Sequence, residues 1–298
     1  MRAQGRSPWI GSRPIFGLAP QRTSPDLRPS SSLIAEPAPS NPSPSPPARA
    51  EILGIPLAIS DYDEVVAWMD AMIAADARGW LTAAAVNLIM SAHDNPATMR
   101  AVQGATLAVP DGQPLVWALR LLGHARATRV YGPDLMAHYC AHAASTGTPI
   151  YLYGGRSEQA LELLTARLSE RFPGLRIAGG YSPPFRPLTV EERAQAVERI
   201  DGSGAQVVWV GTGQPKQELW MSEMRPRLAA PLLVGVGAAF DFHAGIVSQA
   251  PAWMQRGGLE WLYRLSREPR RLWRRYASQN PRFVAGFARQ WVYERRRS

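Results

Sequence analysis

Cysteine and histidine are scarce in this sequence, and both shortages limit the chemistry it can hold. One cysteine (Cys140) and five histidines occur among 298 residues. A single cysteine excludes a disulfide framework and a cysteine-based metal site, and it fits a reducing cytoplasm. No pair of histidines has the spacing of a zinc site. We therefore expect no cysteine-bound metal or zinc site and a cytoplasmic location.

Long hydrophobic runs are also missing. A membrane-spanning helix needs roughly 20 consecutive apolar residues, whereas the longest apolar runs here, such as residues 232–240, have the length of a strand. The sequence therefore predicts a protein that does not cross a bilayer.

Lysine is almost absent although the chain is strongly basic, with a formal net charge of +9. Residues 1–50 contain six arginines and two acidic residues, and residues 255–298 contain twelve arginines and three acidic residues. The stretch between them has fifteen basic and nineteen acidic residues. Basic ends favour an anionic partner, which could be a membrane surface, a nucleic acid or a phosphorylated ligand.

Composition divides the chain into three parts. Residues 1–48 are rich in proline, serine and arginine and cannot bury enough apolar surface to offset their ordering entropy, so we expect them to be disordered. Residues 49–254 are long enough for one α/β catalytic core. Residues 255–298 are expected to form a basic amphipathic helical appendage.

The middle part alternates short apolar runs with segments of helical periodicity. This alternation predicts a Rossmann-like α/β fold, in which a mostly parallel sheet carries helices on both faces. The expected strands lie within residues 52–59, 80–86, 106–109, 150–153, 175–178, 206–210 and 232–236. The expected helices span residues 61–75, 88–99, 113–122, 133–145, 158–171, 191–200 and 217–225.

Ligands of such folds bind beyond the carboxyl ends of the strands. The polar or glycine-rich residues that follow the predicted strands are therefore the candidate site: Asn87, Asp111, Gly154, Gly155, Tyr181, Gly211–Gln217 and Asp241. The only lysine of the chain, Lys216, lies in a glycine-rich turn that follows a strand and opens a helix. Backbone N–H groups and the helix dipole favour phosphate at such a turn.

Several short motifs are weak. Asp61-Tyr62-Asp63 has the form of a metal-binding Asp-x-Asp, but its place before an amphipathic helix favours helix capping. Gly211-x-Gly213 lacks the third glycine of the dinucleotide-binding motif, because Lys216 stands there.

Arginines and aromatic residues are interleaved throughout the C-terminal segment, and Phe283, Phe287 and Trp291 recur four residues apart. This pattern suits the headgroup level of an anionic membrane. The alternatives are a solvated basic face on a helix packed against the core and, less favoured, a nucleic-acid-binding surface.

Taken together, these motifs resemble the WecG/TagA/CpsF glycosyltransferases, also called glycosyltransferase family twenty-six. The resemblance covers about residues 51–276 and is carried by residues 52–56, 87, 110–112, 129–135, 151–155, 180–185, 211–218, 235–245, 250–251, 259–265, 268–271 and 274–276. One position departs from the family pattern, because Ala85 replaces the usual threonine two residues before Asn87.

The resemblance implies an inverting enzyme that needs neither metal nor cofactor. Such an enzyme works at the inner face of the bacterial plasma membrane and moves a sugar from a UDP-sugar to a polyprenyl-diphosphate-linked glycan. The donor could be UDP-N-acetylmannosamine (UDP-ManNAc), UDP-glucose or a UDP-uronate. The product could belong to an exopolysaccharide, a capsule or a teichoic-acid-like polymer.

The same resemblance assigns roles to the candidate residues. Asp111 is expected to be the general base, with Asn87 and Arg129 positioning the acceptor. Donor binding is expected from Gly154, Gly155, Tyr181, Gly211, Gly213, Gln217 and Asp241, with Gln217 as the main polar contact, Tyr181 near the uracil and Asp241 on the ribose. Diphosphate or membrane contacts are expected from Arg264, Arg271 and Arg274. An NAD-dependent oxidoreductase of the Rossmann type remains the alternative on the α/β pattern alone, and a nucleic-acid-binding module on the arginine-rich tail alone.

Overall fold

The computed structural model describes residues 43–297, apart from the side chains of Ala252, Arg256 and Arg271. Most of the segment predicted to be disordered, residues 1–42, therefore lies outside the described residues. The fold begins with a strand at Arg49.

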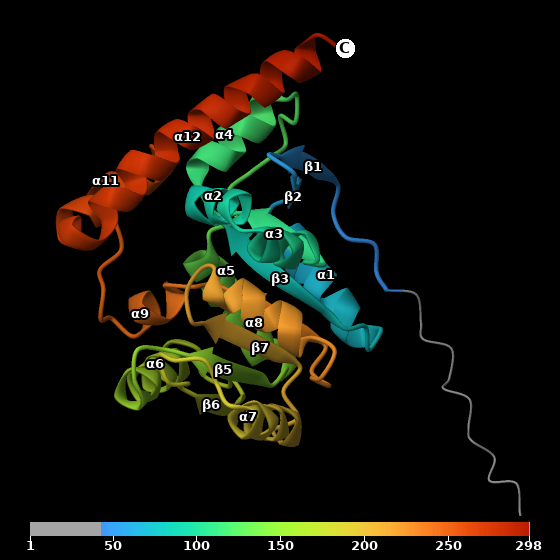
Figure 1. Cartoon of the computed structure of the whole chain (residues 1–298). Helices are drawn as coiled ribbons and strands as arrows, with labels where there is room; N and C mark the ends of the chain where they lie inside the picture. The colour runs from blue at the N-terminus through green and yellow to red at the C-terminus, as the bar shows by residue number, and fades with distance from the viewer. Residues whose placement is uncertain (1–42, 298) are drawn as a thin grey trace, which may run out of the picture. The chain divides into compact units, whose positions relative to one another are not determined.

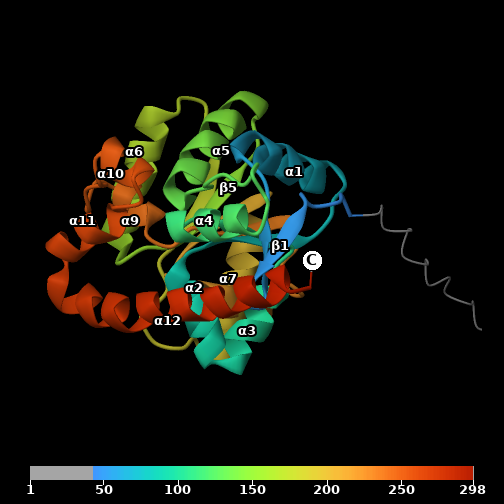
Figure 2. The same ribbon diagram turned by 90° about the horizontal axis from the view of Figure 1, so that it is seen from above.

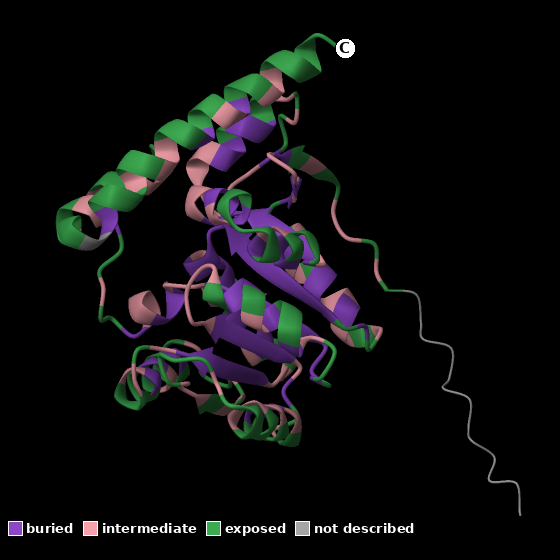
Figure 3. Ribbon diagram, in the orientation of Figure 1, coloured by how far each residue is buried: buried purple, intermediate pink, exposed green. Residues whose placement is uncertain are grey.

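A six-stranded parallel sheet forms the centre of the fold (Figure 1). Its strand order is β4-β3-β8-β7-β5-β6. Its strands are β3 (Gly79–Ala84), β4 (Leu107–Pro110), β5 (Ile150–Gly154), β6 (Ile177–Tyr181), β7 (Val207–Gly211) and β8 (Leu232–Gly235). Apart from the edge strand β6 and the last residue of β7, every residue of these strands is buried (Figure 3). Burial on both faces explains why the strands appear in the sequence as nearly continuous apolar runs.

Twelve helices are described: α1 (Tyr62–Ala74), α2 (Val86–Asp94), α3 (Pro96–Gln103), α4 (Gln113–Leu121), α5 (Gly132–Thr146), α6 (Glu158–Arg171), α7 (Val190–Gly202), α8 (Lys216–Met224), α9 (Ala239–His243), α10 (Ala252–Arg256), α11 (Glu260–Arg267) and α12 (Pro269–Arg295). They surround the sheet, so the predicted α/β class and its parallel sheet are confirmed.

Each face of the sheet has its own apolar core. Val207 and Trp209 of β7 pack with side chains of α1, α5, α6 and α9. Val208 and Val210 point to the opposite face and pack with α7 and α8. The alternation follows from the two-residue period of a strand. A third cluster joins α2, α3 and α4 to the hairpin and to α12.

The apolar stretch after residue 48 forms an antiparallel hairpin of β1 (Arg49–Ile52) and β2 (Ile55–Ala58). Leu53 and Gly54 make its turn, and both have a positive φ, of 50° and 83°. Two left-handed residues match the right-handed twist of a two-residue hairpin.

One predicted helix, residues 88–99, is divided into α2 and α3. Asn95 ends α2, and its side chain accepts hydrogen bonds from the N–H groups of Ala97 and Thr98 at the start of α3. Pro96 occupies the first turn of α3, where its missing N–H costs no helical hydrogen bond.

The C-terminal half of α12 packs against the rest of the fold (Figure 2). Phe283 and Phe287 are buried in the cluster formed with α2 and the hairpin, and Trp291 is partly buried against it. The Gln290 side chain accepts from the Leu53 N–H at 2.8 Å and donates to the Glu51 carbonyl at 2.7 Å. The aromatic stripe expected to face a membrane is therefore a packing stripe, as the core-packed alternative predicted.

Within residues 43–297, no helix combines the length and the apolar character that crossing a bilayer requires.

Candidate active site

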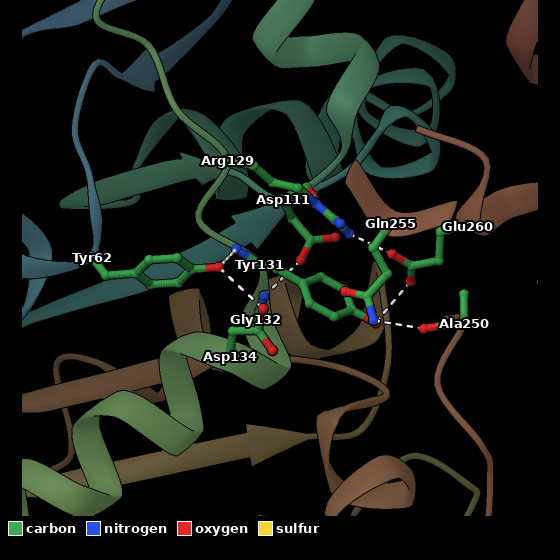
Figure 4. Close-up of polar contacts among 9 residues, drawn as sticks. All are labelled: Tyr62, Asp111, Arg129, Tyr131, Gly132, Asp134, Ala250, Gln255 and Glu260. Atoms are coloured by element: carbon green, nitrogen blue, oxygen red, sulfur yellow. Dashed lines mark hydrogen bonds and ion pairs between the residues drawn. The ribbon is translucent and has the colours of Figure 1, made fainter. Parts of the chain in front are cut away.

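Asp111 lies directly beyond the carboxyl end of β4, and two backbone contacts hold it there. Its N–H donates to the Ala84 carbonyl of β3 at 2.8 Å. Its Oδ1 accepts from the N–H of Gly132, the first residue of α5, at 2.7 Å (Figure 4). A helix N-terminus stabilises negative charge, so this contact favours the carboxylate form.

Arg129 connects Asp111 to the C-terminal helices. Its Nε donates to the Asp111 carbonyl at 2.5 Å, and its Nη2 donates to Oε2 of Glu260 at 2.6 Å (Figure 4). The hydroxyl of Tyr131 donates to the other oxygen of Glu260 at 2.7 Å. The Arg129 guanidinium also lies 4.1 Å from the centroid of the Tyr131 ring. The first residue of α11 is thereby fixed beside the end of β4.

Burial raises the pKa of the Asp111 carboxyl from its ordinary value of 3.8 to about 6, and the charge of Glu260 adds to the rise. Arg129, the Gly132 N–H and Arg264 oppose that rise. A carboxylate with a pKa near the working pH is well suited to accept a proton, because general-base efficiency is greatest there.

A small cavity of about 120 Å³ opens onto Asp111. Asn87, Arg129, Glu260 and Arg264 also line it. The structure thus brings together all three residues predicted to be catalytic, Asp111, Asn87 and Arg129, although both donor groups of Arg129 described above are already engaged.

A larger cavity of about 750 Å³ lies beyond the ends of β5, β7 and β8. Predicted residues on its wall are Gly155, Gly211, Gly213, Lys216, Asp241 and Arg264. Arg264 lines both cavities. Side chains of Arg156, Lys216 and Arg264 provide positive charge, and Tyr153, Trp220 and Phe242 provide aromatic surface. Tyr153 and Trp220 stack with ring centroids 3.9 Å apart.

Two of the predicted glycines are required by close backbone packing. A Cβ on Gly154 would lie 2.6 Å from the carbonyl carbon of Gly211, and a Cβ on Gly211 would lie 2.5 Å from the ring of Phe240. The Gly155 N–H donates to the Gly211 carbonyl at 3.3 Å. These glycines join the ends of β5 and β7, and Gly155 and Gly211 line the larger cavity.

Gln217 was predicted to contact the donor, but the structure places it inside the protein. It is fully buried, its Oε1 accepts from the Gly237 N–H at 3.0 Å, and its Nε2 donates to Glu218 at 2.9 Å. Glu218 in turn accepts from the Thr82 hydroxyl at 2.7 Å. Because its polar atoms are used within the fold, Gln217 supports the turn at Gly237 from behind.

Other predicted residues also lie apart from the cavities. Tyr181 packs beside Tyr153, with ring centroids 6.0 Å apart, and Tyr153 rather than Tyr181 lines the larger cavity. Arg274 is exposed and lies over the ring of Trp273. The side chain of Arg271 lies outside the described residues.

The structure adds contacts that the sequence did not show. Arg156 forms an ion pair with Asp241 at 2.9 Å on the wall of the larger cavity. Gln214 donates to the Ala83 carbonyl at 2.6 Å and accepts from Asn87 at 3.1 Å. The sequence did offer an indication for Glu260, because this residue belongs to one of the motifs that carry the family resemblance.

Asp61 is the N-cap of α1, and its Oδ1 accepts from the Glu64 N–H at 2.9 Å. The capping interpretation of Asp61-Tyr62-Asp63 is therefore confirmed. Among the side chains that the structure describes, no three His, Cys, Asp or Glu residues gather into a group able to hold a metal ion.

Comparison with known protein families identifies a match over most of the chain. The model of the glycosyl transferase WecG/TagA/CpsF family matches residues 50–297, which include the sheet, both cavities and α10–α12. The match gives no support to the alternative of a nicotinamide-dependent oxidoreductase.

Proposed function

Because the chain belongs to the WecG/TagA/CpsF family of glycosyltransferases, we propose that it moves a sugar from a UDP-sugar to a polyprenyl-diphosphate-linked glycan. The product would be part of a bacterial cell-surface polysaccharide. One observation carries the proposal beyond family membership. A carboxyl group with a pKa raised to about 6 lines a small cavity that shares Arg264 with a larger, cationic one.

In this proposal the larger cavity binds the UDP-sugar. Arg156, Lys216 and Arg264 on its wall supply positive charge for a diphosphate. The stacked pair of Tyr153 and Trp220 offers an aromatic surface for the uracil, the role first expected of Tyr181. Asp241 remains the candidate for the ribose hydroxyls, and its ion pair with Arg156 positions both side chains.

The smaller cavity then receives the acceptor sugar. Asp111 takes the proton of the acceptor hydroxyl while that oxygen attacks the anomeric carbon of the donor. Attack from the side opposite the leaving UDP inverts the configuration at that carbon. The cationic side chains of the larger cavity stabilise the charge that develops on the leaving diphosphate, so the step needs no metal.

We also propose that α10–α12 bring the enzyme to the inner face of the plasma membrane. Trp253, Trp261, Leu262 and Trp273 are exposed hydrophobic side chains of these helices, and twelve arginines lie among residues 255–298. Exposed tryptophan next to arginine suits the headgroup region of an anionic bilayer. The test is sedimentation of the full chain with phosphatidylglycerol vesicles. Replacing Trp253 and Trp273 by serine should weaken binding, and unchanged binding would contradict this role.

The central test is the substitution Asp111→Asn. The side-chain amide oxygen that this change introduces still accepts from the Gly132 N–H, so the fold is retained, but the amide cannot take a proton. We expect turnover to fall by roughly 10²–10⁴, the usual contribution of a general base. UDP binding, measured by calorimetry, should change little, because Asp111 lies outside the larger cavity.

The donor is identified by screening UDP-glucose, UDP-N-acetylmannosamine and UDP-uronates with a short-chain polyprenyl diphosphate glycan. Wild-type turnover by the asparagine variant would reject Asp111 as the base. A wild-type enzyme that binds no UDP would reject the proposed donor class.

A further inference from the structure

We propose that Glu260 is a positioning residue that couples docking of α11 at the end of β4 to the charge state of Asp111. The inference rests on the proposed function, in which Asp111 is the base. Both carboxylate oxygens of Glu260 already accept hydrogen bonds within the protein. We therefore do not expect Glu260 to contact the reacting atoms itself. It would act through Arg129.

The contact of Glu260 is well buried for an ion pair. The side chains of Arg129 and Glu260 are only 17% and 13% exposed, whereas the arginine and glutamate of the Arg126–Glu64 pair are 83% and 41% exposed. Exposed ion pairs contribute little to stability, whereas removing one partner from a buried pair is strongly destabilising. The Arg129–Glu260 pair is therefore able to hold α11 in place.

The position of this contact in the chain gives it a coupling role. Glu260 is the first residue of α11, and the same helix carries Arg264, which lines both cavities. Its partners, Arg129 and Tyr131, belong to the segment between α4 and α5 that also supplies the Gly132 N–H to Asp111. Docking α11 through Glu260 therefore brings Arg264 to the cavities and changes the charge beside Asp111 in the same event.

The charges explain the effect on the base. Without Glu260, the Arg129 guanidinium would act on Asp111 alone and would favour its carboxylate, which makes a weak base. With Glu260 docked, the guanidinium is neutralised and a second carboxylate lies nearby, so Asp111 holds a proton more readily. Arg264 arrives on the same helix and lowers the pKa of Asp111, but by less than Glu260 raises it, so docking leaves a stronger base with Arg264 in place to receive the donor diphosphate.

The charged and titratable groups that act on Asp111 from the neighbouring elements enter this balance. They are Tyr62 of α1, Arg129 and Tyr131 of the segment before α5, and Glu260 and Arg264 of α11, while Asp134 of α5 acts on Tyr62. Glu260 is the acidic member that arrives with α11.

The test follows the Asp111 carboxyl directly, by carbon-13 NMR titration of the full chain labelled at aspartate, with Asp111→Asn to assign the signal. The wild-type signal should titrate near pH 6. In Glu260→Gln the amide still accepts from Arg129 and donates to the Tyr131 hydroxyl, but the negative charge is gone. We expect the midpoint to fall by roughly one pH unit.

The matched control is Glu64→Gln, which removes a carboxylate from an arginine partner at an exposed position. Its Asp111 midpoint should equal that of the wild type. A Glu260→Gln midpoint equal to the wild-type value would overturn the inference.

A second measurement, hydrogen exchange of the full chain, tests docking without relying on activity. Glu260→Ala removes both charge-assisted contacts and should speed exchange in residues 260–267 at least about tenfold. Residues 281–295, which Phe283 and Phe287 fasten to the core, should exchange as in the wild type. Unchanged exchange in α11 would also overturn the inference.

The failure of this inference differs from a failure of the proposed function. If wild-type Asp111 titrates at its ordinary value, or if Asp111→Asn keeps its turnover, the base assignment fails whatever Glu260 does. If Asp111 behaves as the base but the Glu260 variants change neither its titration midpoint nor exchange in α11, only the proposed coupling is rejected.

Discussion

Asn87 donates a hydrogen bond to the side chain of Gln214 at 3.1 Å and thereby joins the two cavities. Asn87 lies after β3 and lines the smaller cavity, whereas Gln214 belongs to the turn after β7 that borders the larger one. Gln214 also donates to the Ala83 carbonyl at 2.6 Å. One side-chain amide therefore fixes the distance between the proposed acceptor and donor sites.

This bridge predicts coupled effects of Asn87→Ala and Gln214→Ala. Each change removes the hydrogen bond between the two side chains, which contributes about 1 kcal/mol, and Gln214→Ala also removes the bond to the Ala83 carbonyl. Turnover should therefore fall about fivefold in Asn87→Ala and at least as much in Gln214→Ala, and the double variant should be little worse than Gln214→Ala. A double-mutant cycle on turnover and on urea unfolding measures the coupling, and strictly additive losses would show that the bridge has no effect on the reaction.

The raised pKa of Asp111 predicts the pH dependence of the reaction. A base acts only when it is deprotonated, so activity is present above the folded-state pKa and is lost below it. We expect kcat/KM to be half-maximal near pH 6 and to fall about tenfold per pH unit below that value. An acidic limb centred near pH 4 would show that Asp111 is not desolvated in the working enzyme.

Glu218 predicts a pH dependence of stability. Burial raises the pKa of this fully buried carboxyl from 4.5 to about 7, and its Oε2 has no hydrogen-bond partner. Because the folded-state pKa is raised, the folded chain binds the proton more tightly, and stability falls as pH rises from 4.5 to about 7. Glu218→Gln should lack this loss and gain up to roughly 3 kcal/mol over the wild type across that range.

Urea unfolding of both proteins at pH 5 and pH 8 measures the difference. The gain should be small at pH 5 and large at pH 8. A difference that does not depend on pH would mean that Glu218 stays protonated, or stays charged, throughout.

Two glycines with different surroundings predict different outcomes for the same substitution. Gly154 has a φ of +135° and its new Cβ would meet the backbone of Gly211 at 2.6 Å, so Gly154→Ala should cost at least about 2 kcal/mol. Gly202, in α7, has open space around a Cβ, and Gly202→Ala should be neutral or stabilise by up to about 1 kcal/mol. Thermal unfolding of both variants compares them, and equal shifts would contradict the packing argument.

Ala85 predicts a stabilising change. It is the N-cap of α2 with an extended backbone and makes no side-chain cap hydrogen bond. Ala85→Thr restores the hydroxyl of the family pattern, and that hydroxyl can accept an unpaired helix N–H. We expect a gain of about 1 kcal/mol in the free energy of unfolding. Ala85→Val adds the same bulk without the hydroxyl and should show no such gain.

The sequence predicted the sheet well because its strands are buried on both faces. Val207–Val210 appear as an uninterrupted apolar run, which is typical of a central parallel strand. The edge strand β6 was placed about two residues early, since Gly179 and Gly180 give it no apolar pattern. The helical region predicted at residues 88–99 is confirmed, but its division into two helices was not predicted; Asn95 and Pro96 end one helix and begin the next.

The position of the residues that follow the strands was predictable, because the carboxyl ends of parallel strands lie at one edge of the sheet. Asp111 and Asn87 reach a common cavity for that reason. Contacts between distant segments were not predictable. Glu260 meets Arg129 across 131 residues, and no local spacing encodes that pairing. Gln217 was expected to contact the donor, and the sequence does not show that the first turn of α8 directs its side chain inward.

The packing of α12 through Phe283, Phe287 and Gln290 limits how the lipid-linked acceptor of the proposed function can arrive. Residues 236–282, between β8 and the packed half of α12, are held at both ends. They can therefore move away from the core only as a loop and not as a free C-terminal tail. In the proposed function, a lipid-linked acceptor would therefore have to reach the smaller cavity without release of the whole C-terminal segment.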